Sequence, residues 1–261
     1  MERVNCNFCG CGDARVKYRV KAEKYHPAYL EAASIVGPEP PGEFTVVCCE
    51  RCGLRYLNPR YDATELAAVY PAEQYTSRLG CLSGSILFRR SGDIPQVQLR
   101  GETVDSAKNK ARLAAIASYK EPGRILDVGC NNGSFLGLLE REGWETYGVD
   151  FSQTAIDNAR THFAQTRTFC GELKGAEYPD AYFDVVTVYN TIEHLPDPLQ
   201  VLQEIKRICK PTGLIVIQTI DFDSANARIF PHSLIFPAQH LYYFRGCDLR
   251  DCMGRLGFSF A

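Results

Sequence analysis

The chain has 261 residues, of which 45% are hydrophobic, enough to form one full domain and a smaller module. Charged residues make up 23%, and the formal net charge of −2 gives no overall electrostatic basis for binding nucleic acid or an anionic membrane. No apolar run is long enough to cross a bilayer and the first residues have no apolar signal core, so we expect a cytoplasmic protein.

Twelve cysteines are many for a cytoplasmic chain, and their spacing favours metal binding over disulfides. Two Cys-x-x-Cys-Gly motifs each present two thiolates from a tight turn, and the glycine allows the backbone to fold back toward the sulfurs. Four thiolates suit tetrahedral zinc in a closed, structural site. Buried free cysteines or a redox pair are the alternatives, and Cys48 is one residue out of register. The predicted zinc ligands are Cys6, Cys9, Cys49 and Cys52.

The first half of the chain reads as a small module followed by a bridge. Strands are predicted at 15–20 and 43–47, a strand running into a turn at 54–59, and helices at 64–70 and 106–119. The first two strands are expected to pair and to carry the cysteine motifs. The predicted organisation is a zinc-binding module at 1–62, a helical and cofactor-covering bridge at 63–121, and a catalytic domain at 122–261.

From residue 124 onward the chain alternates strands with helices. The predicted strands are 124–129, 145–149, 166–170, 183–189 and 213–219, and the predicted helices are 133–142, 154–163, 199–209 and 248–256. This alternation predicts an α/β fold with a Rossmann-like, doubly wound, mostly parallel sheet. Ligands of such sheets bind outside the carboxyl ends of the strands.

The turn after the first of these strands, from Asp127 to Gly133, brings backbone close to a ligand. It is neither the dinucleotide fingerprint nor a phosphate-cradling loop, so it does not demand a pyrophosphate ligand. Asp150 ends the next strand, where a carboxylate can accept both ribose hydroxyls of an adenosine ligand. An exposed turn aspartate is the alternative reading of Asp150.

These motifs resemble the class I S-adenosylmethionine-dependent methyltransferases over residues 124–258. The matching stretches are Ile-Leu-Asp-Val-Gly-Cys-Asn-Asn-Gly at 125–133, Gly-Val-Asp-Phe-Ser at 148–152, Phe-Asp-Val-Val at 183–186 and Glu-His-Leu-Pro-Asp-Pro at 193–198. The resemblance implies that the cofactor is S-adenosylmethionine. The cofactor-binding residues that it implies are Asp127, Gly129, Cys130, Asn131, Gly133, Asp150, Phe151, Glu172, Leu173 and Asn190.

The resemblance also implies roles for these residues. The turn residues would line the methionine part of the cofactor, and Asp127 would orient the turn or meet the amino group. Asp150 would bind the ribose with Phe151 beside the adenine. Glu172 and Leu173 would contact the adenine edge and face, and Asn190 would lie near the sulfonium. The family usually has glycine where this chain has Asn131, and asparagine is the side chain best tolerated at positive φ.

The front half resembles a zinc-containing branch of these enzymes, through the paired cysteine motifs, the stretch Gly-Leu-Arg-Tyr-Leu-Asn-Pro-Arg at 53–60, and Tyr70 and Tyr75. That branch includes sugar C-methyltransferases and enzymes of surface-polysaccharide and natural-product clusters. The resemblance implies that Tyr75 folds over the cofactor, with a packing tyrosine as the alternative.

Methyl transfer to a hydroxyl or carbon acid needs a base to remove a proton. His194 follows a strand at the expected mouth of the cofactor pocket, Glu193 is adjacent, and His240 precedes the last helix. We hypothesise that His194 or His240 is the base, with loop capping or a backbone hydrogen bond as the alternative for each. The aromatic stretch 221–244 is a candidate substrate lid, or else a cluster that seals the sheet edge.

The expected partner is a small molecule, such as a sugar, a sugar nucleotide or a natural-product intermediate, and nucleic acid is not expected. An RNA methyltransferase with a zinc ribbon and a non-catalytic binding module are the alternatives. The sequence ends at 257–261, where the family adds an antiparallel strand pair. The catalytic domain is therefore expected to be truncated or to end its sheet early, and homodimerisation would cover such an edge.

Overall fold

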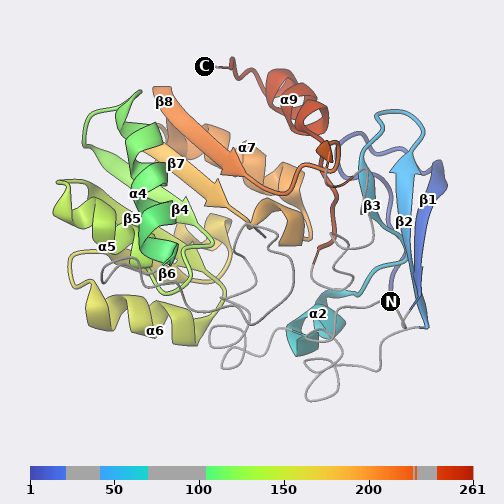
Figure 1. Cartoon of the computed structure of the whole chain (residues 1–261), viewed down its shortest axis with the longest axis horizontal. Coiled ribbons are helices and arrows are strands. Elements are labelled where there is room, and N and C mark those ends of the chain that lie inside the picture. Colours follow the sequence, from blue (N-terminus) through green and yellow to red (C-terminus); the bar gives the residue numbers. More distant parts are fainter. Residues whose placement is uncertain (22–41, 70–103, 226, 228–239, 261) are drawn as a thin grey trace. The chain divides into compact units, whose positions relative to one another are not determined.

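A computed structural model of the chain describes residues 1–21, 42–69, 104–225, 227 and 240–260 (Figure 1). The chain forms two compact units, each described by itself. The first unit joins residues 1–71 with 189–206 and 217–261, and the second comprises 72–188 and 207–216. The predicted domain limits at 62 and 121 stay predictions. Among the described helices, none has the length and apolar character that a bilayer span requires.

A three-stranded antiparallel sheet in the order β1-β2-β3 organises the first unit. Its elements are β1 (Ala14–Lys21), β2 (Glu43–Cys49) and β3 (Arg55–Leu57), followed by helix α2 (Ala63–Val69). The register pairs Ala14 with Cys49 and Val20 with Phe44, so the predicted pairing of the first two strands is confirmed. The sheet thereby places the second cysteine motif at the end of β2.

A five-stranded sheet in the order β6-β5-β4-β7-β8 organises the second unit. Its strands are β4 (Arg124–Val128), β5 (Glu145–Asp150), β6 (Arg167–Cys170), β7 (Phe183–Tyr189) and β8 (Cys209–Gln218). Strand β4 runs parallel to both β5 and β7, and β5 runs parallel to β6. The predicted α/β fold with a mostly parallel sheet is confirmed.

Helices α4 (Val104–Ala117), α5 (Ser134–Arg141) and α6 (Gln153–His162) belong to this sheet unit (Figure 1). Helix α4 packs against α5, α5 against β5, and α6 against β5 and β6. The buried strand residues Ile125, Leu126, Val185 and Val186 form the centre of the core. These apolar runs are why β4 and β7 occupy the middle of the sheet.

The remaining elements follow the sheet strands along the chain. They are η3 (Leu173–Ala176), η4 (Ile192–His194), α7 (Pro198–Ile208) and α9 (Gly246–Arg255). The expected strand at 213–219 is wrong at its start, because β8 begins at Cys209. Pro211 and Gly213 predict a turn, but β8 lies at one end of the sheet order, where a residue without an N–H is tolerated.

Candidate functional site

The turn between β4 and α5 has the backbone conformation that the sequence predicts. Gly129, Asn131 and Gly133 all have positive φ, at 80°, 49° and 75°, so the expectation that asparagine adopts this conformation is confirmed. Gly133 caps α5, and a Cβ there would lie 2.9 Å from the Cβ of Ala159. The turn therefore fits closely against Ala159 of α6, and a side chain at position 133 would not fit there.

Asp150 holds this turn through its carboxylate. Its Oδ2 accepts a hydrogen bond from the Asn131 N–H at 2.8 Å, and its Oδ1 accepts one from the Ser152 N–H at 2.9 Å. A carboxylate has about four acceptor positions, so these two bonds do not use all of them, and a bond to ribose hydroxyls stays a prediction. Phe151 beside it is 62% exposed, and its contact with an adenine stays a prediction. These residues fit an adenosyl ligand.

Asp127 is buried under the same turn, at 5% exposure. Burial raises the pKa of Asp127 to about 7, against a hydrogen bond from Thr187 and the charge of Arg112, which both lower it. The Thr187 hydroxyl donates to Asp127 Oδ1 over 2.7 Å. A buried carboxyl poised near neutrality is suited to a cationic ligand group, since a cation favours its ionised form.

The other implied cofactor residues of this unit lie in two different environments. The Cys130 side chain is buried, and a Cβ on Gly148 would lie 2.7 Å from its Sγ. Leu173 is buried at the start of η3, whereas Glu172 before it is exposed. Their contact with a cofactor stays a prediction. Tyr75 lies outside the described residues, as does Tyr70.

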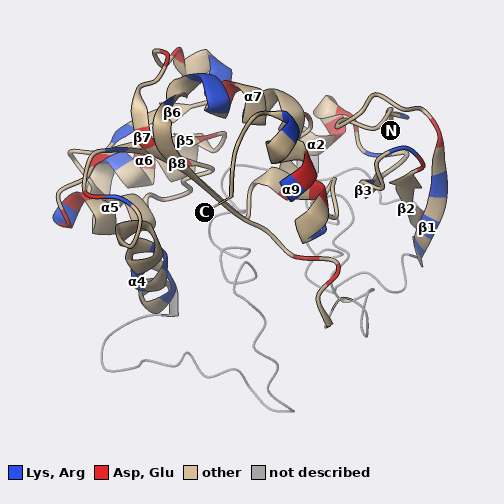
Figure 2. Cartoon of the chain, turned by 90° about the horizontal axis from the view of Figure 1, so that it is seen from above, with Lys and Arg blue, Asp and Glu red and all other residues tan. Residues whose placement is uncertain are grey.

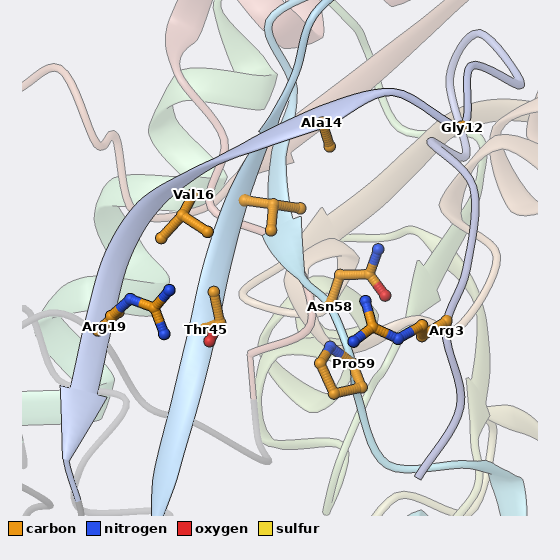
Figure 3. Close-up of a pocket in the computed structure, with 9 residues that line it drawn as sticks. Arg3, Gly12, Ala14, Val16, Arg19, Thr45, Asn58 and Pro59 are labelled. Carbon is orange, nitrogen blue, oxygen red and sulfur yellow. The ribbon is translucent and has the colours of Figure 1, made fainter.

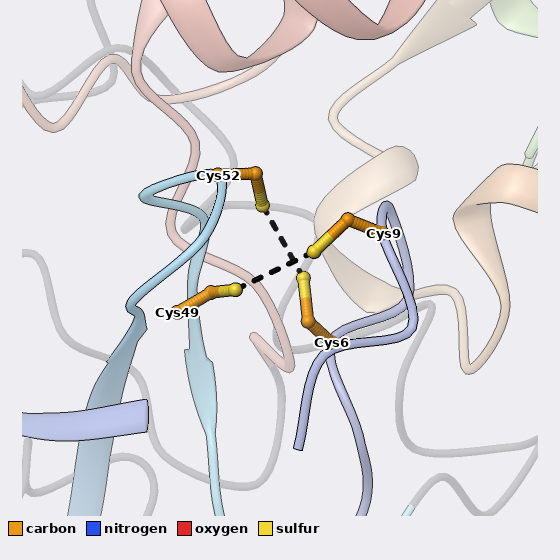
Figure 4. A group of neighbouring side chains, drawn as sticks. All are labelled: Cys6, Cys9, Cys49 and Cys52. Carbon is orange, nitrogen blue, oxygen red and sulfur yellow. Dashed lines mark hydrogen bonds between the residues drawn. The ribbon is translucent and has the colours of Figure 1, made fainter. Parts of the chain in front are cut away.

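The four predicted zinc ligands converge in the first unit (Figure 4). The Sγ atoms of Cys6, Cys9, Cys49 and Cys52 all lie within 4.8 Å of one another. Two of the sulfur pairs are 3.4 and 3.5 Å apart, close to the separation of about 3.8 Å that tetrahedral Zn–S bonds of about 2.3 Å require. The four side chains fit a zinc ion, and the Cys48 thiol points instead to the Gly53 carbonyl.

Both cysteine motifs close as tight turns. The Gly10 N–H donates to the Cys6 carbonyl at 2.8 Å, and the Gly53 N–H donates to the Cys49 carbonyl at 3.0 Å. Both glycines have positive φ, at 71° and 79°, which the sequence spacing anticipates. Backbone geometry therefore orients the sulfurs in both halves of the group in the same way.

The three candidate catalytic residues also lie together, in the first unit. A carboxylate oxygen of Glu193 and a ring nitrogen of each of His194 and His240 lie within 4.8 Å of one another. The two imidazole rings meet edge to face, with centroids 4.7 Å apart. Burial lowers the pKa of His240 well below its usual value, and the charge of His194 lowers it further. We refer to these three residues as the Glu-His-His cluster.

Asn190, the last implied cofactor residue, follows β7 with a φ of 51°. Its N–H donates to the Gln218 carbonyl at 2.7 Å. This bond ties the residue after β7 to the end of β8, and the placement of Asn190 near a sulfonium stays a prediction.

A surface hollow of about 290 Å³ lies on the antiparallel sheet (Figure 3). Arg3, Val16, Arg19, Thr45 and Pro59 are among its lining residues. The Arg19 guanidinium is paired with Glu43 at 2.9 Å. None of the predicted site residues lines this hollow.

Residues 100–260 match a family described as a methyltransferase domain. The chain belongs to this methyltransferase family. The resemblance to methyltransferases that the sequence shows is thus confirmed at the level of the domain family.

Several curated proteins and solved structures are similar to parts of this chain. A protein named ubiquinone biosynthesis O-methyltransferase from Vibrio cholerae is 34% identical over 103 residues, covering 38% of this chain and 42% of the relative. The chain thus spans about two fifths of the curated relatives that it matches. A SAM-dependent methyltransferase structure from Archaeoglobus fulgidus is 28% identical, with a TM-score of 0.50, covering 59% of this chain and 69% of that one. A putative methyltransferase from Bacillus halodurans is 19% identical, with a TM-score of 0.51 over 58% and 69%, and shares the fold.

The chain contains supporting residues that the sequence does not reveal. Asn7, inside the first cysteine motif, accepts from the Leu199 N–H at 2.9 Å and donates to Asp197 at 2.8 Å. Arg60 donates to the Pro196 carbonyl at 3.0 Å. The Asp-Pro pair at the start of α7 is a sequence signal for a helix cap, but these partners are distant in sequence.

Proposed function

We propose that the protein transfers a methyl group from S-adenosylmethionine to a hydroxyl or an acidic carbon of a small molecule. The observation that carries this proposal is the hydrogen bond from the Asn131 N–H to Asp150, because it joins the positive-φ turn to the carboxylate suited to ribose. When bound, the cofactor supplies an electrophilic methyl group on a sulfonium. The protein then needs to orient the acceptor and remove its proton.

The Glu-His-His cluster is the proposed place of proton removal. Two observations support this role. The Glu193 carboxylate is buried, and one of its oxygens lies close to a ring nitrogen of each of the two histidines. His194 is the preferred base, since it is half-buried, whereas the lowered pKa of the buried His240 makes that imidazole a weak proton acceptor. The four cysteines are proposed to hold a structural zinc, supported by their geometry and donor type.

The acceptor is proposed to be a sugar, a sugar nucleotide or a related metabolite, on the resemblance of the cysteine motifs and the 53–60 stretch to the zinc-containing branch. A phenolic hydroxyl is the second candidate, because the curated relatives are named ubiquinone biosynthesis O-methyltransferases. Both acceptors require removal of a proton, so the same cluster serves either one.

RNA is less well supported as an acceptor. Arg15, Lys17, Arg19 and Lys21 place positive charge along β1, which Figure 2 shows as alternating blue segments. However, β1 is an edge strand, and charged side chains on an edge prevent pairing with other chains. No aromatic ring among the described residues of β1 is exposed for stacking on bases, since Tyr18 is half-buried.

The test supplies methyl-labelled S-adenosylmethionine to the zinc-loaded protein with three acceptor pools: nucleotide-linked sugars, phenols and RNA. We expect label in a small-molecule pool. We also expect His194→Asn to lower turnover at least about tenfold, within the range for loss of a general base. Label in RNA alone, or turnover equal to wild type in both His194→Asn and His240→Asn, would overturn the proposal.

A further inference from the structure

The Glu-His-His cluster contains a buried carboxylate oxygen that accepts no hydrogen bond from the described residues. Glu193 is 3% exposed, and its Oε2 has no hydrogen-bond donor among the residues that the structure describes. A buried carboxylate oxygen without a donor destabilises the fold, because the hydrogen bonds that it made to water are not replaced. The oxygen therefore calls for a positively charged or donating partner at this place.

The surrounding atoms favour a metal ion as that partner. A carboxylate oxygen and two imidazole nitrogens within 4.8 Å of one another can all reach one cation. Oxygen and imidazole ligands in this combination suit divalent cations from manganese to zinc. His194 is half-buried, which leaves a side of the cluster open for entry of the ion.

The backbone holds these ligands in place before any ion binds. The N–H groups of Leu241 and Tyr242 both donate to the Glu193 carbonyl, at 2.8 and 3.2 Å. The same strand-like segment is attached to β3, because the Leu57 N–H donates to the Leu241 carbonyl at 3.0 Å and the Tyr243 N–H donates to the Arg55 carbonyl at 3.0 Å. Such fixed segments reduce the ordering cost of cation binding.

We propose that Glu193, His194 and His240 form a second metal site, for a divalent cation bound through one carboxylate and two imidazoles. The site is separate from the four-cysteine group and differs from it in donor chemistry. Three protein ligands leave coordination positions for water or a substrate oxygen. A cation there would lower the pKa of a coordinating acceptor hydroxyl; with the ion bound, His194 would therefore act as a ligand, and its role as base applies to the cluster without the ion.

The test uses the zinc-loaded protein and Mn²⁺, whose preference for oxygen and nitrogen ligands keeps it out of the cysteine site. Loss of the free Mn²⁺ signal in electron paramagnetic resonance measures binding without any methyl-transfer assay. We expect one bound Mn²⁺ per chain, and at least about tenfold weaker binding in Glu193→Gln and in His194→Gln. Glu142→Gln and His162→Gln, at exposed positions directly after α5 and at the end of α6, are the matched controls and should bind like wild type.

Circular dichroism melting of each variant checks that it folds. If the buried Glu193→Gln variant does not fold, the half-buried His194→Gln variant carries the test. The proposal is overturned if wild type binds neither Mn²⁺ nor Co²⁺ outside the cysteine site at millimolar concentration. It is equally overturned if the folded cluster variants bind Mn²⁺ as tightly as the controls. Metal binding without methyl transfer would uphold this inference while refuting the proposed function.

Discussion

Asp127 is an aspartate whose carboxyl lies in the interior of the protein, where its pKa differs clearly from the usual value. The residue is only 5% exposed, and burial raises the pKa of its carboxyl to about 7. The unfolded chain would have a value of about 3.9. Between these two pH values the folded state keeps a proton that the unfolded state has lost, so the free energy of unfolding falls as pH rises from about 4 to about 7.

A prediction at the scale of this residue follows from the decrease in unfolding free energy with rising pH. Asp127→Asn has no proton to lose, and it keeps an oxygen that can accept from the Thr187 hydroxyl. Between pH 5 and pH 8, wild type should lose about 1–3 kcal/mol more unfolding free energy than the variant. Urea unfolding of both proteins at the two pH values measures this difference. Parallel pH profiles would show that the Asp127 carboxyl is not buried as described.

The fold of individual elements is largely predictable from the sequence, because apolar runs and helical periodicity mark β4, β5, β7, α5 and α6. The exceptions have physical reasons. Strand β8 begins four residues earlier than expected, since an edge strand tolerates Pro211. Helix α9 begins at Gly246, two residues earlier than expected, because the Asp248 carboxylate accepts a hydrogen bond from the Arg245 N–H at 2.9 Å and so satisfies a donor before the first turn.

The close approach of α5 to Phe163, the residue that follows α6, gives a prediction at the element scale. A Cβ on Gly137 would lie 2.0 Å from the Phe163 ring, so the half-buried ring must move. We expect Gly137→Ala to cost about 1–2 kcal/mol of unfolding free energy despite the higher helix propensity of alanine.

Gly254, in α9, is the matched control, because a Cβ there meets nothing within 4 Å. Gly254→Ala should raise stability by a few tenths to about 1 kcal/mol. Thermal melting of both variants is the measurement. A stabilised Gly137→Ala variant would contradict the packing of α5 against Phe163.

At the scale of the whole molecule, the sequence predicts which residues form the candidate sites better than it predicts which distant segments pack together. Motif spacing brings the cysteines and the turn residues into the expected groups because each motif is local. The attachment of segments 192–199 and 241–245 to the cysteine module depends on tertiary bonds such as Asn7 to Asp197, and no local pattern specifies them. One compact unit consequently combines the cysteine module with the chain that follows β7 and β8.

The central claim is that the turn at 129–133 and the Asp150 carboxylate bind an adenosyl sulfonium. Calorimetric titration of S-adenosylmethionine into the zinc-loaded protein tests it most directly, with Asp150→Ala as the probe and the exposed Asp157→Ala as control. We predict one site in wild type and in the control, and roughly tenfold to hundredfold weaker binding in Asp150→Ala, as expected for lost hydrogen bonds to a charged group. Absence of binding in wild type, or equal affinity in a folded Asp150→Ala variant, would contradict the claim.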